Sequence, residues 1–561
     1  MEDNIPYTQF ACIGAGFSGI GLGVTLKRWY NITDVQFFER CSSLGGTWYV
    51  NAYPGAACDV PSALYSFSFD SNPLWSRVLA SQEELLAYLE RVARRYELVD
   101  KMKFDAEVSK CEWNEERARW RLTYKDLKTG DVFHHESQFL FSAAGLFSSP
   151  KELDIPGAET FKGQIVHSSR WRSDLDLTDK KVIVIGNGCT GNQIVPAIAP
   201  KVKHLTHLIR SKHWIIPPID RENADMMIKM LKWVPGAVFM QRVMVFALCE
   251  WALMGFYETR FGKWHRERYR AISERFMRRK APEKYHDLLI PDFEYNCKRR
   301  IFSSGYLESL HRDNISLTDE KGLEVTPEGI RTASGLIEAD VIVLANGFQR
   351  HTFLYGTEVV GRGGETIDQH WASFGRPEAY NCCAVSGFPN YFMLLGPNTV
   401  TGHTSCVLAS ENSINYALRV IKPVLDGEAR IANVSRAAEE ENVAELQEAL
   451  KKTVWGGSCG SWYVQEEEGQ VKSNPMAYPW SQGYYWYSSL FPRWEHWEYT
   501  GRVYTRGKRL VGLLPTTAFI VSLAVTFAMR SGPGFRASVI DQVQKAQGLI
   551  LAGLSRAKWG A

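Results

Sequence analysis

The chain has 561 residues, of which 45% are hydrophobic, and a formal net charge of +3. This length exceeds what one hydrophobic core supports, so we expect a globular protein of two or three domains. The small net charge and the absence of a long Lys/Arg block argue against nucleic acid as a partner.

The cysteines and the N-terminus indicate the compartment. Eleven cysteines are too few for a disulfide scaffold, and no C-x-x-C occurs, so we predict neither thioredoxin-type chemistry nor a metal site. The adjacent Cys382 and Cys383 are expected to be merely buried. Because the N-terminus has no basic stretch followed by an apolar core, we predict no secretory signal and a reducing, cytoplasmic location.

The first predicted element is a short apolar strand, followed by a glycine turn and a helix that begins near Ser18. The turn carries a G-x-G-x-x-G series, whose order permits a tight turn, a close approach to a pyrophosphate and close helix packing. The second strand, DVQFFER, ends in Glu39, where a carboxylate can accept hydrogen bonds from a ribose. The pattern predicts a dinucleotide site at Gly14, Gly16, Ser18, Gly19 and Glu39.

The segment GGTWYVNAYPGAACDVPS, at 45–62, has neither helical nor strand periodicity. Its Gly, Pro and Asn residues predict repeated turns, and loops that also carry Trp, Tyr and Asp are more typical of binding surfaces than of spacers.

A second strand, glycine turn and helix follow at 180–199. The next strand ends at Arg210, where the first site has an acid; a guanidinium there matches a 2′-phosphate, and Lys212 can assist. The second site is therefore predicted to bind NADPH through Gly186, Gly188 and Gly191, and the first to bind FAD, because hydride must pass between two such cofactors.

The segment IEADVIVLANGFQ, at 337–349, reads as a buried strand that returns the chain to the first domain. We therefore predict an α/β fold of two Rossmann-like dinucleotide-binding domains, with the NADPH domain inserted in a split FAD domain. The predicted parts are 1–150 (FAD, first part), 151–335 (NADPH, with a helical insertion at about 214–300), 336–505 (FAD, second part) and 506–561 (a tail with an apolar helix).

Two motifs around the glycine turns carry a resemblance to a known family. One has a glycine pair, a Trp, an aromatic-Pro-Gly and an Asp, here Gly45, Gly46, Trp48, Tyr53, Pro54, Gly55 and Asp59. The other is FKGQIVHSSRW, with Phe161, Gly163, His167 and Trp171. Across residues 7–465 the chain resembles the class B flavoprotein monooxygenases, and among them the Baeyer-Villiger monooxygenases.

The resemblance implies that NADPH reduces FAD and that the reduced flavin captures O2 at C4a as a peroxide, which attacks a ketone. In CKRRIFSSGYLESLHRDNISL, Lys298 and Arg299 match the family's paired basic residues, of which the second is catalytic. A buried peroxide anion needs a fixed cation, and Arg stays charged at a pKa above about 12. We predict that Arg299 supplies that charge and that Asp59 anchors it.

Further residues are expected at the cofactors. Thr47, Trp48 and Tyr65 suit the flanks of a flat, polar-edged ring, and Trp462 matches a family Trp on the nicotinamide side. The remaining predicted cofactor contacts are Ala57, Cys58, Asp59, Val108, Cys189, Thr190, Ser211, Lys298 and Arg299.

The chain departs from the family pattern at two positions. Arg172 stands where the second motif usually has Pro or Asp, and Ala57 stands where many members have Arg beside the nicotinamide cofactor. Ala57 leaves both cofactor binding and the type of oxygenation open. His167 reads as a hinge or packing residue rather than a general base, and Asn398 and His403 either face the pocket or support it.

Two apolar segments raise the question of a membrane. Residues 510–529 contain no charge and can span a hydrocarbon core, although a core or dimer helix would look similar. Residues 233–257 are interrupted by Arg242 and Glu250, so we read them as a helical cap over the substrate cleft or a surface lying on lipid.

The sequence therefore favours an NADPH- and O2-dependent FAD monooxygenase that acts on a hydrophobic ketone in secondary metabolism. One alternative keeps the cofactors and oxygenates nitrogen or sulfur. Another is a flavin-binding NADPH oxidase or a membrane-tethered scaffold.

Overall fold

The computed structural model of the chain describes residues 5–501, except 220–221, 224, 351, 458 and 468–469. Residues 1–425 and 430–500 form one compact unit, which contains every element described below. The predicted tail at 506–561 lies outside the described residues.

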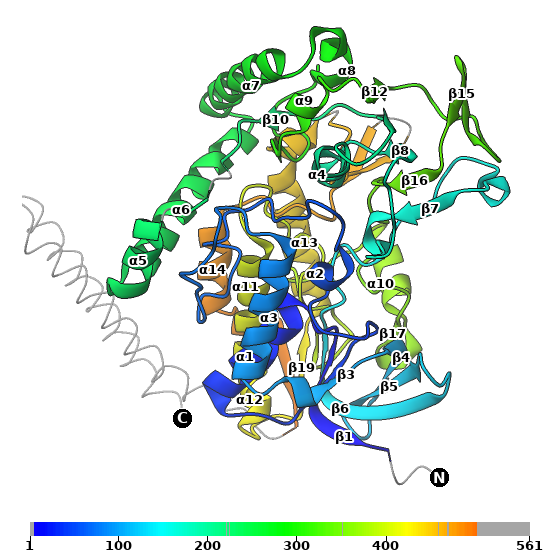
Figure 1. Cartoon of the computed structure of the whole chain (residues 1–561). Helices are drawn as coiled ribbons and strands as arrows, with labels where there is room; N and C mark the ends of the chain where they lie inside the picture. The colour runs from blue at the N-terminus through cyan, green and yellow to red at the C-terminus, as the bar shows by residue number, and fades with distance from the viewer. Residues whose placement is uncertain are drawn as a thin grey trace, which may run out of the picture. The chain divides into compact units, whose positions relative to one another are not determined.

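The FAD domain is built on an eight-stranded sheet (Figure 1) in which β6 joins two kinds of pairing. Along one edge this long strand runs parallel to β1, and along the other edge it runs antiparallel to β5 and then, through residues 140–142, parallel to β18. The apolar run of β1 is buried, as expected for a central parallel strand. The strands are β1 (Tyr7–Ile13), β2 (Val35–Phe38), β3 (Met102–Lys103), β4 (Ala106–Asn114), β5 (Arg119–Asp126), β6 (Val132–Ser142), β17 (Glu358–Val360) and β18 (Tyr391–Met393).

Helices from both parts of the chain complete this domain. Ser410 Oγ, on α11, donates to Ser18 Oγ, on α1, at 2.8 Å, so the first and second parts pack together around one core. The helices are α1 (Phe17–Tyr30), α2 (Thr47–Val50), α3 (Gln82–Arg95), α10 (Ile367–Phe374), α11 (Cys406–Val420), α12 (Lys422–Leu425), α13 (Arg436–Lys451) and α14 (Gln482–Leu490). Small two-stranded sheets pair β19 (Ile431–Val434) with β22 (Trp497–Thr500) and β20 (Gln465–Glu467) with β21 (Gln470–Ser473).

The inserted domain has a five-stranded parallel sheet in the order β12-β9-β8-β16-β7. Its strands are β7 (Gln164–His167), β8 (Lys181–Ile185), β9 (His204–Leu208), β12 (Ile315–Thr318) and β16 (Val341–Leu344), with α4 (Cys189–Ile198) and α9 (Tyr306–Ser309). An antiparallel sheet follows, formed by β13 (Glu324–Thr326), β14 (Gly329–Thr332) and β15 (Gly335–Glu338).

One predicted boundary is wrong. Strand β16 pairs with β7 and β8, so 336–344 belongs to the NADPH domain and the chain returns to the FAD domain only after Leu344. A buried apolar run of four residues fits either parallel sheet equally well, because its periodicity carries no information about its partners.

The predicted helical insertion is present and is bracketed by a short strand pair. β10 (Ile215–Ile216) runs parallel to β11 (Ile301–Phe302), and the helices lie between them. They are α5 (Asp225–Trp233), α6 (Ala237–Leu253), α7 (Arg260–Lys280) and α8 (His286–Leu289). In Figure 1, α5 and α6 lie along the side of the body that also carries α14.

Candidate active site

The first glycine turn has the geometry of a dinucleotide site. Gly14 has φ +105°, and a Cβ there would lie 2.5 Å from the carbonyl oxygen of Ala143. Only glycine fits this turn, which leads through Gly16 into the N-terminus of α1. Glu39 follows β2 directly, and its carboxylate accepts from the backbone N–H of Ala15 at 2.8 Å. The carboxylate is therefore held against the turn, where a ribose is expected.

The predicted flavin wall is an aromatic pair. Trp48 Nε1 donates to the Tyr65 hydroxyl at 3.3 Å, and the two rings meet nearly edge to face, with centroids 5.6 Å apart. Burial raises the pKa of Tyr65 well above its ordinary value, so the phenol is neutral. Thr47 begins α2 beside this pair, and Cys58 is buried in the same loop. Val108 lies on β4, where its carbonyl accepts from Thr357 Oγ1.

The second glycine turn repeats the first. Gly186 has φ +113°, and a Cβ there would lie 2.3 Å from the carbonyl oxygen of Ala345, whereas a Cβ on Gly188 would meet nothing within 4 Å. The start of α4 is thus open on the side from which a pyrophosphate approaches a helix N-terminus. Cys189 and Thr190 form the first turn of α4, and Gly191 packs the helix on β8. The chain therefore fits a dinucleotide at each turn.

Arg210 lies two residues beyond β9, as the sequence predicts. Its side chain is 81% exposed and meets an equally exposed Asp154 at 3.7 Å. Such a pair contributes little, so the guanidinium can bind a 2′-phosphate at small cost. The neighbouring Ser211 accepts from Asn187 Nδ2 through its carbonyl at 3.4 Å.

The structure brings Asp59 and Arg299 together across 240 positions of sequence. Arg299 Nε donates to Asp59 Oδ2 at 2.5 Å, and the side chains are only 25% and 30% exposed. Cys189 Sγ lies 3.8 Å from the same carboxylate oxygen, so the pair is located at the N-terminus of α4. The predicted cation and its anchor thus lie beside the second glycine turn.

The charges of this pair are mutually stabilised. Burial opposes ionisation of Asp59, but the charge and hydrogen bond of Arg299 outweigh it and hold the pKa of Asp59 below its ordinary value. Burial likewise disfavours the guanidinium, but Asp59 outweighs it and raises the pKa of Arg299 well above its ordinary value. Both groups are therefore charged at neutral pH.

Tyr463 is a site residue that the sequence analysis missed. Its hydroxyl hydrogen-bonds to Arg299, and burial keeps its pKa above the ordinary value. The adjacent Trp462 stacks on it with centroids 4.4 Å apart, which brings the predicted nicotinamide-side Trp close to the Asp59–Arg299 pair. Lys298, which precedes Arg299, places its ammonium 4.6 Å from the centre of the Phe293 ring.

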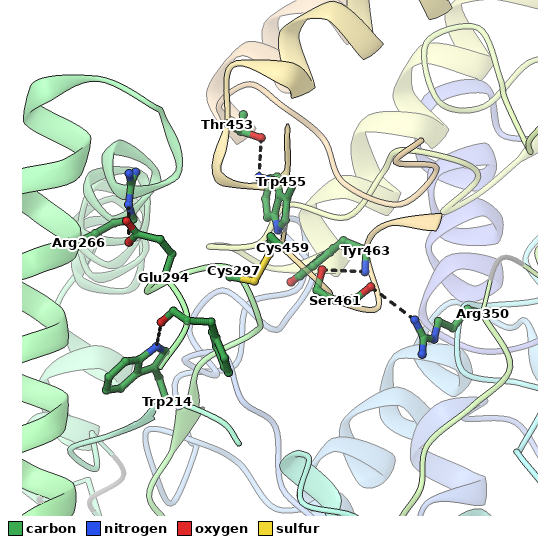
Figure 2. The surroundings of a disulfide bond; sticks show 11 residues. Trp214, Arg266, Glu294, Cys297, Arg350, Thr453, Trp455, Cys459, Ser461 and Tyr463 are labelled. Atoms are coloured by element: carbon green, nitrogen blue, oxygen red, sulfur yellow. Dashed lines mark hydrogen bonds and ion pairs between the residues drawn. A yellow bond between two sulfur atoms is a disulfide. The ribbon is translucent and has the colours of Figure 1, made fainter. Parts of the chain in front are cut away.

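A disulfide fastens these two segments, which the sequence analysis also missed. Cys297 and Cys459 are bonded across 162 positions of sequence and are buried (Figure 2). The bond joins the residue before Lys298 to the loop that carries Trp462 and Tyr463. Among the described residues, the other nine cysteines are free, with Cys382 and Cys383 buried as expected.

Comparisons with known proteins identify the family. Residues 8–282 match the family of flavin-binding monooxygenase-like proteins. The chain is 36% identical over 471 residues to a Baeyer-Villiger monooxygenase of Streptomyces coelicolor, covering 82% of this chain and 87% of that protein. It is 31% identical over 490 residues to an FAD-binding monooxygenase of Aspergillus terreus, covering 84% and 85%.

Comparison with solved structures points to the same family. The cyclohexanone monooxygenase of Rhodococcus sp. Phi1 bound to NADP+ matches with a TM-score of 0.77 at 27% identity, covering 89% of this chain and 100% of that one. A steroid monooxygenase bound to NADP matches with a TM-score of 0.76 at 27% identity, covering 88% and 99%. The chain belongs to the Baeyer-Villiger monooxygenases. It is an NADPH-dependent monooxygenase with FAD as cofactor.

In this monooxygenase the loop at 45–62 also connects the two domains. The Tyr53 hydroxyl donates to Gln193 Oε1 at 2.8 Å, and Gln193 Nε2 donates to the Ala57 carbonyl at 3.0 Å, so the loop binds α4 at two points through one side chain. Ala57 presents only a methyl group where relatives are expected to have a guanidinium.

The remaining candidates of the monooxygenase have supporting contacts. His167 is buried, and its ring nitrogens contact the Gly347 carbonyl and the Ser169 hydroxyl, so it joins the two connections between the domains. Burial lowers its pKa. Asn398 Nδ2 donates to two backbone carbonyls, and His403 contacts Glu250 at 3.0 Å. These contacts favour the supporting roles over the catalytic ones.

Proposed function

We propose that the enzyme inserts one oxygen atom beside the carbonyl of a hydrophobic ketone, with Arg299 and Asp59 as its catalytic pair. The observation that carries this proposal is the half-buried ion pair at the N-terminus of α4, beside the second dinucleotide turn. A reaction that builds negative charge on oxygen is favoured by a fixed cation aimed at that position. FAD, when bound, would supply the redox chemistry: it would take up the hydride of NADPH and, once reduced, could react with O2.

The residues of this chain then have separate tasks. Arg299 stabilises the developing negative charge, Asp59 fixes the direction of the guanidinium, and the Tyr463 hydroxyl provides a second contact to it. Trp48 and Tyr65 form the wall beside the flavin, and Arg210 selects NADPH over NADH through the 2′-phosphate.

An aromatic group next to the pair supports an apolar substrate. Trp455 lies 5.0 Å from Tyr463 and 4.9 Å from Phe256, measured between ring centroids, and Phe256 follows α6 within the helical insertion. Rings of this kind provide dispersion contacts for a lipophilic ketone and few hydrogen-bonding groups.

Product analysis tests the proposal. The enzyme with FAD and NADPH should convert members of a ketone panel, in the presence of 18O2, to esters or lactones that carry one 18O atom. Labelled heteroatom oxides without any ester would exclude ketone oxygenation, and quantitative recovery of oxygen as H2O2 would indicate an NADPH oxidase.

Ala57 gives one specific reason to include amines and sulfides in the panel. The missing cation alters the surroundings of the nicotinamide cofactor. In our proposal, these surroundings determine whether a ketone or a heteroatom is oxygenated. Replacing Ala57 with Arg should shift the ratio of ester to heteroatom oxide upwards if this reasoning is correct. An unchanged ratio would remove Ala57 from the account of specificity.

We further propose that the enzyme works in secondary metabolism in the cytoplasm and associates with membranes through residues 510–529, which lie outside the described residues. The uncharged composition of that segment supports the last point. Loss of one oxygenated metabolite on deletion of the gene would support the role in secondary metabolism. Fractionation of cells into cytoplasm and membranes would test the location and the membrane association.

A further inference from the structure

Helix α6 presents its apolar side chains to solvent. Met240, Met244, Leu248 and Trp251 follow one another at spacings of four, four and three residues, so they form one stripe along the helix. They are between 49% and 65% exposed, and the stripe is about 16 Å long at 1.5 Å per residue. The segment Ala237–Phe256 has a mean hydropathy of 1.5 and is long and apolar enough to cross a membrane, yet only 6% of it is buried.

The opposite face of α6 is polar and fixes this orientation. The Arg242 guanidinium donates to the Ala63 carbonyl and to the Ser66 hydroxyl. Eight residues further along, Glu250 accepts from the backbone N–H of Gln482 and contacts His403. The helix is thus inverted relative to an ordinary surface helix, with its charges turned inwards and its apolar stripe outwards.

Both ends of the stripe carry a tryptophan with a cation. Before α6, the Lys232 ammonium lies 5.1 Å from the Trp233 ring, and Trp233 is 72% exposed. At the other end, Trp251 contacts the ring of Phe261, which contacts Trp264, and the Arg268 guanidinium lies 5.8 Å from the centre of the Trp264 ring. Tryptophan and basic side chains at the edges of an apolar face are typical of proteins that lie in the headgroup region of a bilayer.

The charge next to the stripe favours an anionic partner. Helix α7, which follows α6 after one turn, carries nine Lys or Arg residues and two Glu residues. A second copy of this chain would bring two such basic helices towards each other, whereas anionic headgroups would be attracted to both.

We propose that this ridge, defined as α5, α6 and the start of α7, lies in the surface of an anionic phospholipid bilayer. The stripe enters the boundary between headgroups and acyl chains, and Lys232 and Arg268 contact lipid phosphates. Helix α6 does not cross the bilayer, because Arg242 and Glu250 would then lose their protein partners in hydrocarbon. This inference rests in part on the proposed function, because a lipophilic ketone would dissolve in the bilayer and reach the enzyme from there. Lipid binding itself can be measured without turnover, so the two proposals can fail separately.

Vesicle co-sedimentation of the full-length, FAD-loaded enzyme tests the ridge. We expect binding to vesicles of phosphatidylcholine with phosphatidylserine and much weaker binding to phosphatidylcholine alone. The variant Met244→Gln/Leu248→Gln should lose at least tenfold in partition coefficient. The matched control, Leu127→Gln/Val132→Gln, changes two exposed apolar residues at the β5–β6 turn and should bind like the unchanged protein.

Three outcomes would overturn the proposal. The first is equal partitioning of the ridge variant and the control. The second is a dimer in light scattering that the ridge variant abolishes, without any vesicle binding, because the stripe would then serve a second copy. The variant Ile520→Gln/Leu523→Gln, measured in parallel, separates the ridge from the segment at 510–529. Ester formation in detergent by a protein that does not bind vesicles would refute the ridge and leave the proposed function intact.

Discussion

Replacing Arg299 with Ala removes the cation beside the second dinucleotide turn and should strongly slow oxygenation while leaving the earlier steps intact. At an effective dielectric constant of about 20, unit charges about 4 Å apart interact by about 4 kcal/mol. Removing one donor to a developing oxyanion costs about 2.7 to 4 kcal/mol, which is a factor of about 10² to 10³ in rate. We expect ester formation to fall by that factor.

The assay must separate reduction of the flavin from oxygen transfer. Anaerobic stopped-flow absorbance should show FAD reduction by NADPH at close to the unchanged rate, because Glu39 and Arg210 are untouched. In air, the variant should consume NADPH and release H2O2 in place of ester. The matched control is Arg300→Ala, which removes the next cation, 5.8 Å from the Tyr295 ring, and should keep oxygenation. Ester formation at the unchanged rate by Arg299→Ala would refute our assignment of the cation.

The same reasoning covers the partner of Arg299. Because Asp59 acts only through the guanidinium, Arg299→Ala/Asp59→Ala should lose no more activity than Arg299→Ala alone. A much larger loss in the double variant would mean that Asp59 has a second task, such as contact with the cofactor.

Three further predictions concern other parts of the site. Arg210→Ala should raise the KM for NADPH far more than that for NADH in steady-state kinetics, and an equal rise would contradict the 2′-phosphate contact. Cys297→Ser/Cys459→Ser should have a lower Tm than the oxidised enzyme and the same Tm as the reduced enzyme, because closing a loop of 162 positions stabilises the fold by up to about 5 kcal/mol through chain entropy. The control Cys41→Ser, which changes a free cysteine, should leave the Tm nearly unchanged. The pKa of Asp59 is lowered and that of Arg299 raised, so the ion pair is present above the ordinary Asp value of 3.8 and is lost only as the pH falls below it. The ratio of ester to H2O2 should therefore not titrate through this pair between about pH 5 and 9, and a titration there that Asp59→Asn removes would contradict the assignment.

The two glycine turns could be predicted because their requirements are local. At Gly14 and Gly186, φ is above +100° and a backbone oxygen lies where a Cβ would be, so only glycine fits. The glycine spacing in the sequence therefore predicts these turns. Arg210 and Glu39 could be found for a similar reason, since each follows a strand whose length the apolar pattern defines. The resemblance supplied the distant partner of Asp59, which no local pattern could have given.

The features that were missed depend on pairing between distant segments. Strand β16 is buried and apolar, and only its register against β7 and β8 assigns it to the NADPH domain. The cysteines at 297 and 459 are unremarkable in composition, although one directly precedes the basic pair and the other lies three residues before Trp462. That proximity to two predicted site residues was the available signal.

The disulfide and Tyr463 together show how the catalytic cation is held. Arg299 is bound to the FAD domain by Asp59 in the first part of the chain and by Tyr463 in the second, while Cys297 fixes its own segment to the loop of Tyr463. A long side chain has rotamer freedom that a single ion pair restricts only partly. Asp59, Tyr463 and the disulfide together position the guanidinium before the cofactors bind. Less conformational entropy is therefore lost when negative charge develops beside it. Tyr463→Phe removes one attachment without changing any charge and should therefore lower the ester yield per NADPH more than it lowers the rate of flavin reduction.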